Sequence, residues 1–207
     1  MRKFLIALAL LLAAAVVQAQ TADALWSELM AGNARFVGGS LDYCALQHLR
    51  SATAGGQSPP TSVLACADSR VPAELVFDRS IGELFVVRVA GNVDDTFGVA
   101  SLEYAAHVNK WTKMIVVLGH SDCGAVKASL YPVPPAQPAV DQPTPALYQL
   151  ILRIRASFTT WPHDLREATI MNINYTAAQL ALDPRLAGVP IVKAYYDVAT
   201  GRVERIP

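Results

Sequence analysis

Short apolar runs alternate along the chain with segments in which apolar residues recur at helical spacing. The apolar runs lie at residues 62–65, 84–89, 114–118 and 191–196. The helical segments lie at residues 25–36, 99–106, 146–158 and 164–180. Runs of about four to eight apolar residues are typical of buried strands, and strands that alternate with helices are typical of parallel sheets. The pattern therefore predicts an α/β fold, with a mostly parallel central β-sheet flanked by helices.

Residues with strong local preferences mark several boundaries of these segments. Asp94 or Asp95 can cap the second helical segment, and Asp164 with Glu167 has the spacing of a capping box. The proline-rich stretch from Tyr131 to Pro145 predicts a surface excursion without regular structure. The sequence shows no internal repeat, and this stretch gives no reason to divide the chain into two domains.

Two of the predicted strands are followed by residues that bind metal ions. Cys66 follows the run at 62–65, and His120 and Cys123 follow the run at 114–118. A helical segment between the two strands makes a right-handed crossover, so both strands end at the same edge of the sheet. We therefore expect two thiolates and one imidazole to meet at this edge.

This ligand set is typical of zinc. Three protein ligands leave the fourth tetrahedral position open for water or substrate, which is typical of a catalytic site. A structural site would need a fourth cysteine or histidine, and the remaining cysteine, Cys44, lies outside both motifs. Asp68 and Arg70, two residues apart after Cys66, can form a bidentate carboxylate–guanidinium pair beside the metal. An ordinary surface ion pair is the alternative.

The ordered set of motifs resembles the β-class carbonic anhydrases, zinc enzymes that reversibly hydrate carbon dioxide to bicarbonate and a proton. The two ligand motifs are Cys66-Ala67-Asp68-Ser69-Arg70 and His120-Ser121-Asp122-Cys123-Gly124. The supporting motifs are Gly32-Asn33-x-Arg35-Phe36, Gly82-Glu83-Leu84-Phe85-Val86-Val87-Arg88, Ala90-Gly91-Asn92, Tyr196-Asp197 and Thr200-Gly201. The resemblance extends from about Leu25 to Arg205 and implies a carbonate dehydratase, which is a lyase, with one zinc ion per subunit.

The resemblance also assigns roles to residues around the metal ligands. It implies that Asp68, paired with Arg70, accepts a hydrogen bond from water on zinc. The residues that it implies in substrate binding are Gln57, Phe85, Ala90, Tyr104 and Gly124. By itself a loop glutamine is usually solvated, and packing in the core would explain Phe85 and Ala90 equally well. The glutamine and the tyrosine are expected to act across a subunit interface, which implies a homodimer or a multiple of dimers.

Two further features of the family bear on assembly and regulation. An N-terminal helix of the family packs on the neighbouring subunit, but for segment 25–36 the alternative, that it covers its own sheet, has comparable weight. Some bacterial members bind bicarbonate at a second pocket that includes a tryptophan three residues before the first zinc cysteine. Here that position is Val63, although Arg88, the basic partner of the pocket, is present. We therefore expect the regulatory pocket to be absent.

The beginning of the chain has the pattern of an export signal. Arg2 and Lys3 precede an uninterrupted apolar run at residues 4–17, and Val17-Gln18-Ala19 supplies small residues for cleavage. The run is shorter than the roughly 20 residues that a spanning helix needs. We therefore expect a signal peptide at residues 1–19, one mature domain at residues 20–207, and a periplasmic or secreted protein without a membrane span.

Charge and composition narrow the expected partners. The full chain has 17 basic and 17 acidic side chains, and loss of Arg2 and Lys3 would leave it slightly acidic. The sequence has no basic cluster interleaved with aromatic residues, which is the pattern that would indicate nucleic-acid binding. The family resemblance implies a small-molecule substrate, carbon dioxide or bicarbonate, as the partner, and the charge pattern indicates no nucleic acid beside it. Two alternatives stay open: a carbonyl sulfide or carbon disulfide hydrolase with the same ligands, and a non-catalytic exported zinc-binding protein.

Overall fold

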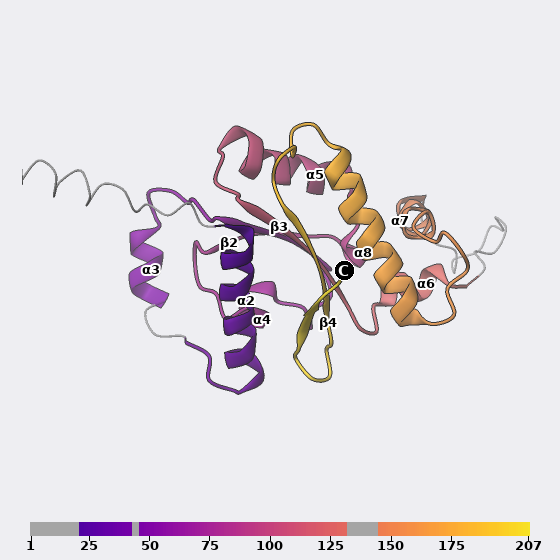
Figure 1. Ribbon diagram of the computed structural model, residues 1–207, viewed down its shortest axis with the longest axis horizontal. Helices are drawn as coiled ribbons and strands as arrows, with labels where there is room; N and C mark the ends of the chain where they lie inside the picture. The colour runs from indigo at the N-terminus through magenta and orange to yellow at the C-terminus, as the bar shows by residue number, and fades with distance from the viewer. Residues whose placement is uncertain (1–20, 43–45, 132–144) are drawn as a thin grey trace, which may run out of the picture.

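The computed structural model describes residues 21–42, 46–131 and 145–207 (Figure 1). The strands are β1 (Thr61–Ala65), β2 (Leu84–Arg88), β3 (Met114–His120), β4 (Ile191–Tyr196) and β5 (Val203–Arg205). They form one sheet in the order β2-β1-β3-β4-β5, in which only β5 is antiparallel to its neighbour. The predicted α/β fold with a mostly parallel sheet is confirmed.

Helices cover both faces of this sheet. The α-helices are α2 (Ala22–Val37), α3 (Leu46–Ala52), α4 (Ala73–Val76), α5 (Thr96–Glu103), α6 (Gly124–Ser129), α7 (Pro145–Arg155) and α8 (Leu165–Leu182). A 3-10 turn, η1 (Ala90–Asn92), follows β2, and a π-helical turn, η2 (Tyr104–Val108), continues α5. Figure 1 shows α2 and α8 on opposite sides of the strands.

The alternating side chains of β1 divide the core between the two faces, because successive residues of a strand point in opposite directions. Val63 and Ala65 pack with the apolar residues of α2 and α4. Leu64 packs on the other face with α5 and α8. A third apolar cluster, formed by the residues on either side of η1 together with α6, α7 and α8, contains Cys66 and Cys123 at the carboxyl end of the sheet.

The N-terminal helix α2 packs against its own sheet. Leu25 and Leu29 are buried in the same cluster as β1, β3 and β4. Asn33 donates hydrogen bonds to the carbonyl oxygens of Val76, at 2.9 Å, and Gly201, at 2.8 Å, and accepts one from the Val203 N–H. These contacts explain the Gly-Asn motif as a structural anchor and favour the second of the two alternatives for segment 25–36.

Two expectations about the strands and helices need correction. Strand β2 was expected to be buried, but its residues are half-buried or exposed, because it is an edge strand that pairs only with β1. The third helical segment, α7, ends at Arg155, three residues earlier than expected. An apolar run in the sequence does not reveal whether its strand has one neighbour or two.

The predicted helix caps are present in the structure. Asp95, rather than Asp94, caps α5 by accepting a hydrogen bond from the Gly98 N–H. Asp164 caps α8 by accepting from the Glu167 N–H at 2.8 Å, while the Glu167 carboxylate accepts from His163, one residue before the cap.

The predicted signal peptide, Cys44 and nearly all of the proline-rich stretch lie outside the described residues. Among the helices that are described, none combines the length and apolar character needed to cross a bilayer.

Candidate metal centre

Three side chains that can ligate a metal converge at the carboxyl end of the two central strands. Cys66 directly follows β1, His120 is the last residue of β3, and Cys123 is the N-cap residue of α6. One ligand atom from each of the three lies within 4.8 Å of the others. All three residues are buried, with exposed fractions of 3%, 0% and 1%. The structure thus brings together the three residues that the sequence indicated.

The orientation of His120 leaves one ring nitrogen for a ligand. Its Nδ1 lies 2.9 Å from the Ser121 carbonyl oxygen and donates a hydrogen bond to it. Its Nε2 is buried and has no hydrogen-bond partner within the part of the chain that the structure describes. Buried polar atoms are nearly always paired, and a metal-binding histidine typically donates its other N–H to a carbonyl or carboxylate. The unpaired Nε2 therefore fits a metal ligand.

The two sulfur atoms lie close together, and the pKa values of their thiols are shifted in opposite directions. Cys66 Sγ lies 3.9 Å from Cys123 Sγ and accepts hydrogen bonds from the backbone N–H groups of Asp68, at 3.4 Å, and Gly91, at 3.2 Å. The hydrogen bond with Cys123, together with these N–H groups, lowers the pKa of the Cys66 thiol, whereas the interaction with Cys66 raises the pKa of Cys123. A divalent cation would allow both sulfurs to be thiolates at once, because ligand sulfurs bind metals in that form.

These donors fit zinc, which accepts two thiolates and one imidazole and leaves a fourth position open. Cys66, His120 and Cys123 would hold it. The neighbouring Cys66 sulfur has the largest effect on the pKa of Cys123 and raises it, whereas the backbone N–H groups of Val126 and Ala125 at the start of α6 lower it to a smaller extent.

Asp68 and Arg70 form the expected bidentate pair. Arg70 Nε donates to Asp68 Oδ1 at 2.9 Å, and Arg70 Nη2 donates to Asp68 Oδ2 at 2.7 Å. This pairing holds the pKa of the Asp68 carboxyl well below its usual range, so the carboxylate stays ionised. Asp68 Oδ2 also lies 4.0 Å from His120 Nε2. The pair is therefore part of the metal centre rather than a remote surface ion pair.

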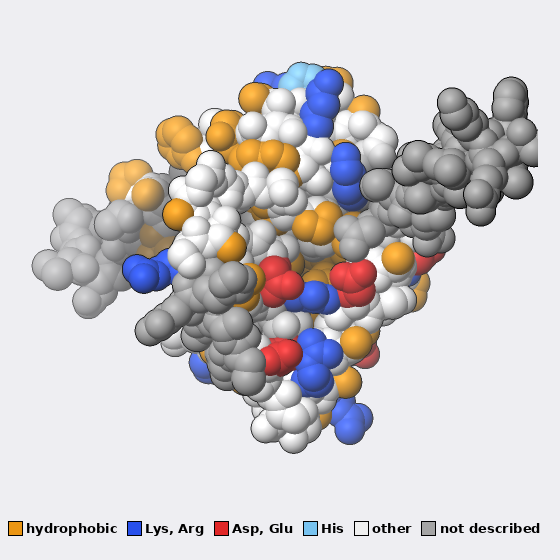
Figure 2. Space-filling model, turned by 90° about the vertical axis from the view of Figure 1, so that its left-hand side faces the viewer, with side chains coloured by type: hydrophobic (Ala, Val, Ile, Leu, Met, Phe, Trp, Pro, Cys, Tyr) orange, Lys and Arg blue, Asp and Glu red, His pale blue; other side chains and the backbone are white. Residues whose placement is uncertain are grey.

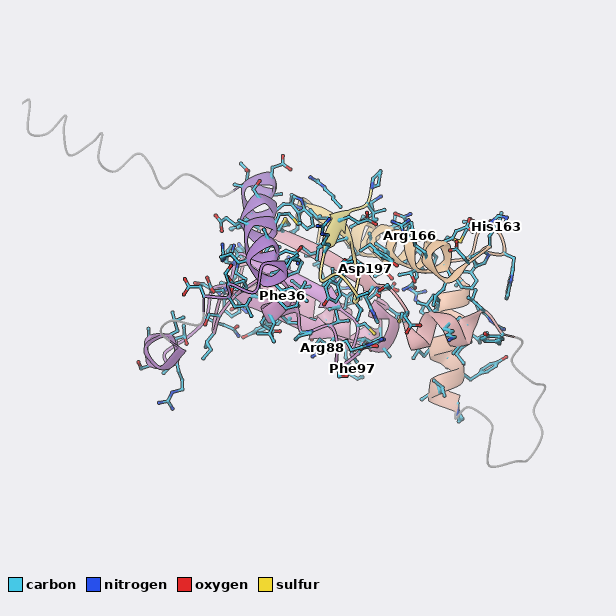
Figure 3. The ribbon with its side chains drawn as sticks, turned by 90° about the horizontal axis from the view of Figure 1, so that it is seen from below. Phe36, Arg88, Phe97, His163, Arg166 and Asp197 are labelled. Atoms are coloured by element: carbon cyan, nitrogen blue, oxygen red, sulfur yellow. The ribbon has the colours of Figure 1, made fainter. Side chains whose placement is uncertain are left out.

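Arg88 holds the loop that follows β1 and carries Cys66, a role that the sequence did not indicate. From the end of β2 its guanidinium donates to the carbonyl oxygens of Cys66, at 3.1 Å, and Asp68, at 2.6 Å (Arg88 is labelled in Figure 3). The only local signal was a basic residue at the carboxyl end of the neighbouring strand.

Val63 is fully buried in the core cluster shared with α2.

The residues expected to bind substrate fall into two groups. Ala90 and Gly124 flank the centre, because Ala90 precedes Gly91 and Gly124 follows Cys123. Gln57 is exposed and lies four residues before β1. Because β1 is about 16 Å long at about 3.3 Å per residue, Gln57 belongs to the opposite, amino-terminal edge of the sheet.

The two aromatic residues of this set also lie away from the metal ligands of their own chain. Phe85 is paired in register with Ser62, in the amino-terminal half of β1. Tyr104 is 49% exposed and makes an edge-to-face contact with Trp111, at 5.8 Å between ring centroids. Trp111 precedes β3, so one chain does not bring Gln57, Phe85 and Tyr104 to the metal centre.

A family profile described as carbonic anhydrase matches residues 61–203 of the chain. A carbonic anhydrase from Mycolicibacterium smegmatis is 38% identical over 196 residues, which cover 87% of this chain and 91% of that protein. Carbonic anhydrase 2 from Mycobacterium tuberculosis is 47% identical over 109 residues, which cover 52% of each protein.

Solved structures show the same architecture. A β-carbonic anhydrase from Coccomyxa, solved in complex with acetazolamide, has a TM-score of 0.67 and 25% identity, and the match covers 87% of this chain and 85% of that one. One of the structures of tetrameric β-carbonic anhydrases from Sordaria macrospora has a TM-score of 0.64 and 22% identity, and the match covers 88% of this chain and 96% of that one.

Proposed function

We propose that this chain, which belongs to the β-carbonic anhydrase family, reversibly hydrates carbon dioxide to bicarbonate and a proton with one zinc ion per subunit. The observation that carries this proposal is the convergence of three buried ligand atoms, one of them the unpaired Nε2 of His120, beside the Asp68–Arg70 pair. Metal storage alone would not require a carboxylate–guanidinium pair beside the ligands.

The residues around the centre have separable tasks. When bound, zinc supplies Lewis acidity and lowers the pKa of a coordinated water molecule towards neutrality. The two guanidinium bonds fix the Asp68 carboxylate, so that Oδ2 faces the centre as a hydrogen-bond acceptor and orients the attacking water. Ala90 and the Gly124 backbone, which flank the ligands, limit and orient the small uncharged substrate.

Stopped-flow measurement of carbon dioxide hydration by the zinc-loaded full chain tests the proposal directly. We expect hydration well above the buffer rate, and headspace assays with carbonyl sulfide and carbon disulfide serve as the substrate controls. A rate equal to that of buffer, from protein with stoichiometric zinc, would refute the proposed reaction. Faster turnover of either sulfur compound would reassign the substrate.

The distribution of the substrate-binding residues supports an active homodimer or a multiple of dimers. Gln57 and Tyr104 lie at the edge of the sheet opposite to the metal ligands, so they can serve a metal centre only from another subunit. Apolar side chains reach the surface on the face shown in Figure 2. Val37, Ile81 and Val108 are among the large apolar residues that are exposed, at 40%, 43% and 64%.

Subunit complementation provides a sharp test of this arrangement. We expect Gln57→Ala to lower activity, and we expect co-assembly with inactive Cys123→Ala subunits to restore part of it. The reason is that a Gln57→Ala subunit keeps its metal ligands and would receive an intact Gln57 from its partner. Activity is measured after mixing and reassembly, with light scattering to establish the mass. Activity in the monomer would contradict the proposal. So would hybrid assemblies that are no more active than assemblies of Gln57→Ala alone.

Bicarbonate is expected to inhibit only as the product, without cooperativity. Val63 is buried in the core, and Arg88 Nε and Nη2 donate to the loop carbonyl oxygens of Cys66 and Asp68. A ligand shifts a conformational equilibrium only through differential affinity for its states, so loss of the pocket removes the switch. Rates measured against bicarbonate at fixed pH should give a Hill coefficient of about 1. Steep inhibition that chloride at equal ionic strength does not reproduce would contradict this expectation.

A further inference from the structure

Gly91 is held from both sides at the metal centre. Its N–H donates to Cys66 Sγ at 3.2 Å, and its carbonyl oxygen accepts a hydrogen bond from Asn172 Nδ2 at 2.6 Å. Its backbone is in the left-handed region, with φ 68° and ψ 16°. A Cβ atom at this position would come within 2.8 Å of Ile154 Cδ1, so the site requires glycine. The direction of the N–H towards sulfur therefore depends on what fixes this one residue.

Asn172 is a polar side chain in an otherwise closely packed interior. It lies in the middle of α8, is 1% exposed, and is followed by Ile173, a fully buried residue of the apolar core. Within the described part of the chain, its Oδ1 has no hydrogen-bond partner. A buried amide with one unpaired atom is unfavourable compared with a leucine of similar size. The bond from Nδ2 to Gly91 is the contact that distinguishes asparagine from an apolar residue here.

We propose that Asn172 is a positioning residue of the metal centre, which fixes the Gly91 peptide so that its N–H donates to the Cys66 ligand sulfur. This inference rests on the proposed zinc function. Groups that hydrogen-bond to metal ligands orient them and tune their donor strength. Asn172 acts on the ligand indirectly, because its hydrogen bond fixes the Gly91 peptide and the Gly91 N–H donates to Cys66. Helix α8, which carries Asn172, contributes no ligand itself. Loss of the amide would leave Gly91 free to turn its N–H away from sulfur.

Two variants and a matched control test this role. Asn172→Leu keeps the approximate volume and removes the donor, and Asn172→Ala does so with a smaller side chain that needs no new packing space. The control is Thr176→Val, one helical turn later on α8. Thr176 is fully buried and its hydroxyl has no hydrogen-bond partner among the described residues, so its loss breaks no contact to the centre. The melting temperature of each metal-free variant establishes that it is folded.

The decisive readouts are zinc affinity, measured by competition with a chromophoric chelator, and the thiolate-to-cobalt charge-transfer band of the cobalt-substituted protein. We expect both Asn172 variants to bind zinc about 10–100-fold more weakly and to shift this band, because this is the usual cost of losing a contact to a ligand. Thr176→Val should match the wild type in both. Wild-type affinity and an unchanged band in the folded Asn172 variants would overturn the positioning role.

These readouts separate the inference from the proposed function, since neither requires turnover. If the wild type hydrates carbon dioxide and the Asn172 variants bind zinc normally, the positioning role fails alone. If the wild type binds zinc without hydrating carbon dioxide, and the variants bind it more weakly, the proposed reaction fails and the positioning role stands.

Discussion

Replacing Cys123 with alanine is expected to remove most of the bound zinc and, with it, nearly all carbon dioxide hydration. Cys123 supplies one of three buried ligand atoms that lie within 4.8 Å of one another, and its loss leaves Cys66 and His120. Two protein ligands are too few to hold zinc in the manner of known catalytic sites. We expect the zinc affinity to fall by more than about 100-fold, beyond the usual effect of losing a contact behind a ligand.

The measurement is zinc content per subunit after dialysis, together with the hydration rate of the same sample. Cys66→Ala and His120→Ala should behave in the same way. Cys44→Ala provides the matched control, because Cys44 lies outside both ligand motifs and its replacement should leave zinc content and rate unchanged. Full zinc content and full rate in Cys123→Ala would show that the ligands are assigned wrongly.

The sequence was sufficient to predict the sheet and the convergence of the ligands because both depend on periodicity along the chain. The runs that became β1 and β3 each end beside a cysteine or histidine. Adjacent parallel strands must then place those residues at one edge. The same logic located the Asp68–Arg70 pair, whose partners are two residues apart.

Contacts between segments that are distant in sequence could not be predicted in this way. The Arg88 bonds to the loop after β1 and the Asn172 bond to Gly91 depend on strand order and helix rotation. The half-buried state of β2 depends on its place at the sheet edge. Gln57 and Tyr104 were placed by resemblance alone, and the fold of one chain keeps them away from its own metal ligands.

Asp68→Asn is expected to lower kcat by roughly 10²–10⁴-fold, the usual contribution of a positioned proton-handling group, while zinc content stays at the wild-type level. The amide keeps the shape of the side chain but replaces one acceptor oxygen with a donor, which faces the Arg70 guanidinium or the centre unfavourably. Asp122→Asn is the matched control. Arg70 Nη1 lies 3.5 Å from Asp122 Oδ2, and the Asp122 side chain is 66% exposed. Its replacement should change the rate by less than about fivefold, since exposed ion pairs contribute about 0–1 kcal/mol.

Arg70→Lys separates the geometry of the pair from its charge. Lysine keeps the positive charge, but a point-like ammonium cannot reproduce the two parallel bonds to Asp68 Oδ1 and Oδ2. The carboxylate, whose Oδ2 is already 4.0 Å from His120 Nε2, would then be free to turn towards the metal and occupy its open position. We therefore expect Arg70→Lys to lose activity while it binds zinc at least as tightly as the wild type. Chelator competition and hydration kinetics on one preparation measure both quantities, and wild-type activity in Arg70→Lys would show that charge alone, without the bidentate contact, is sufficient.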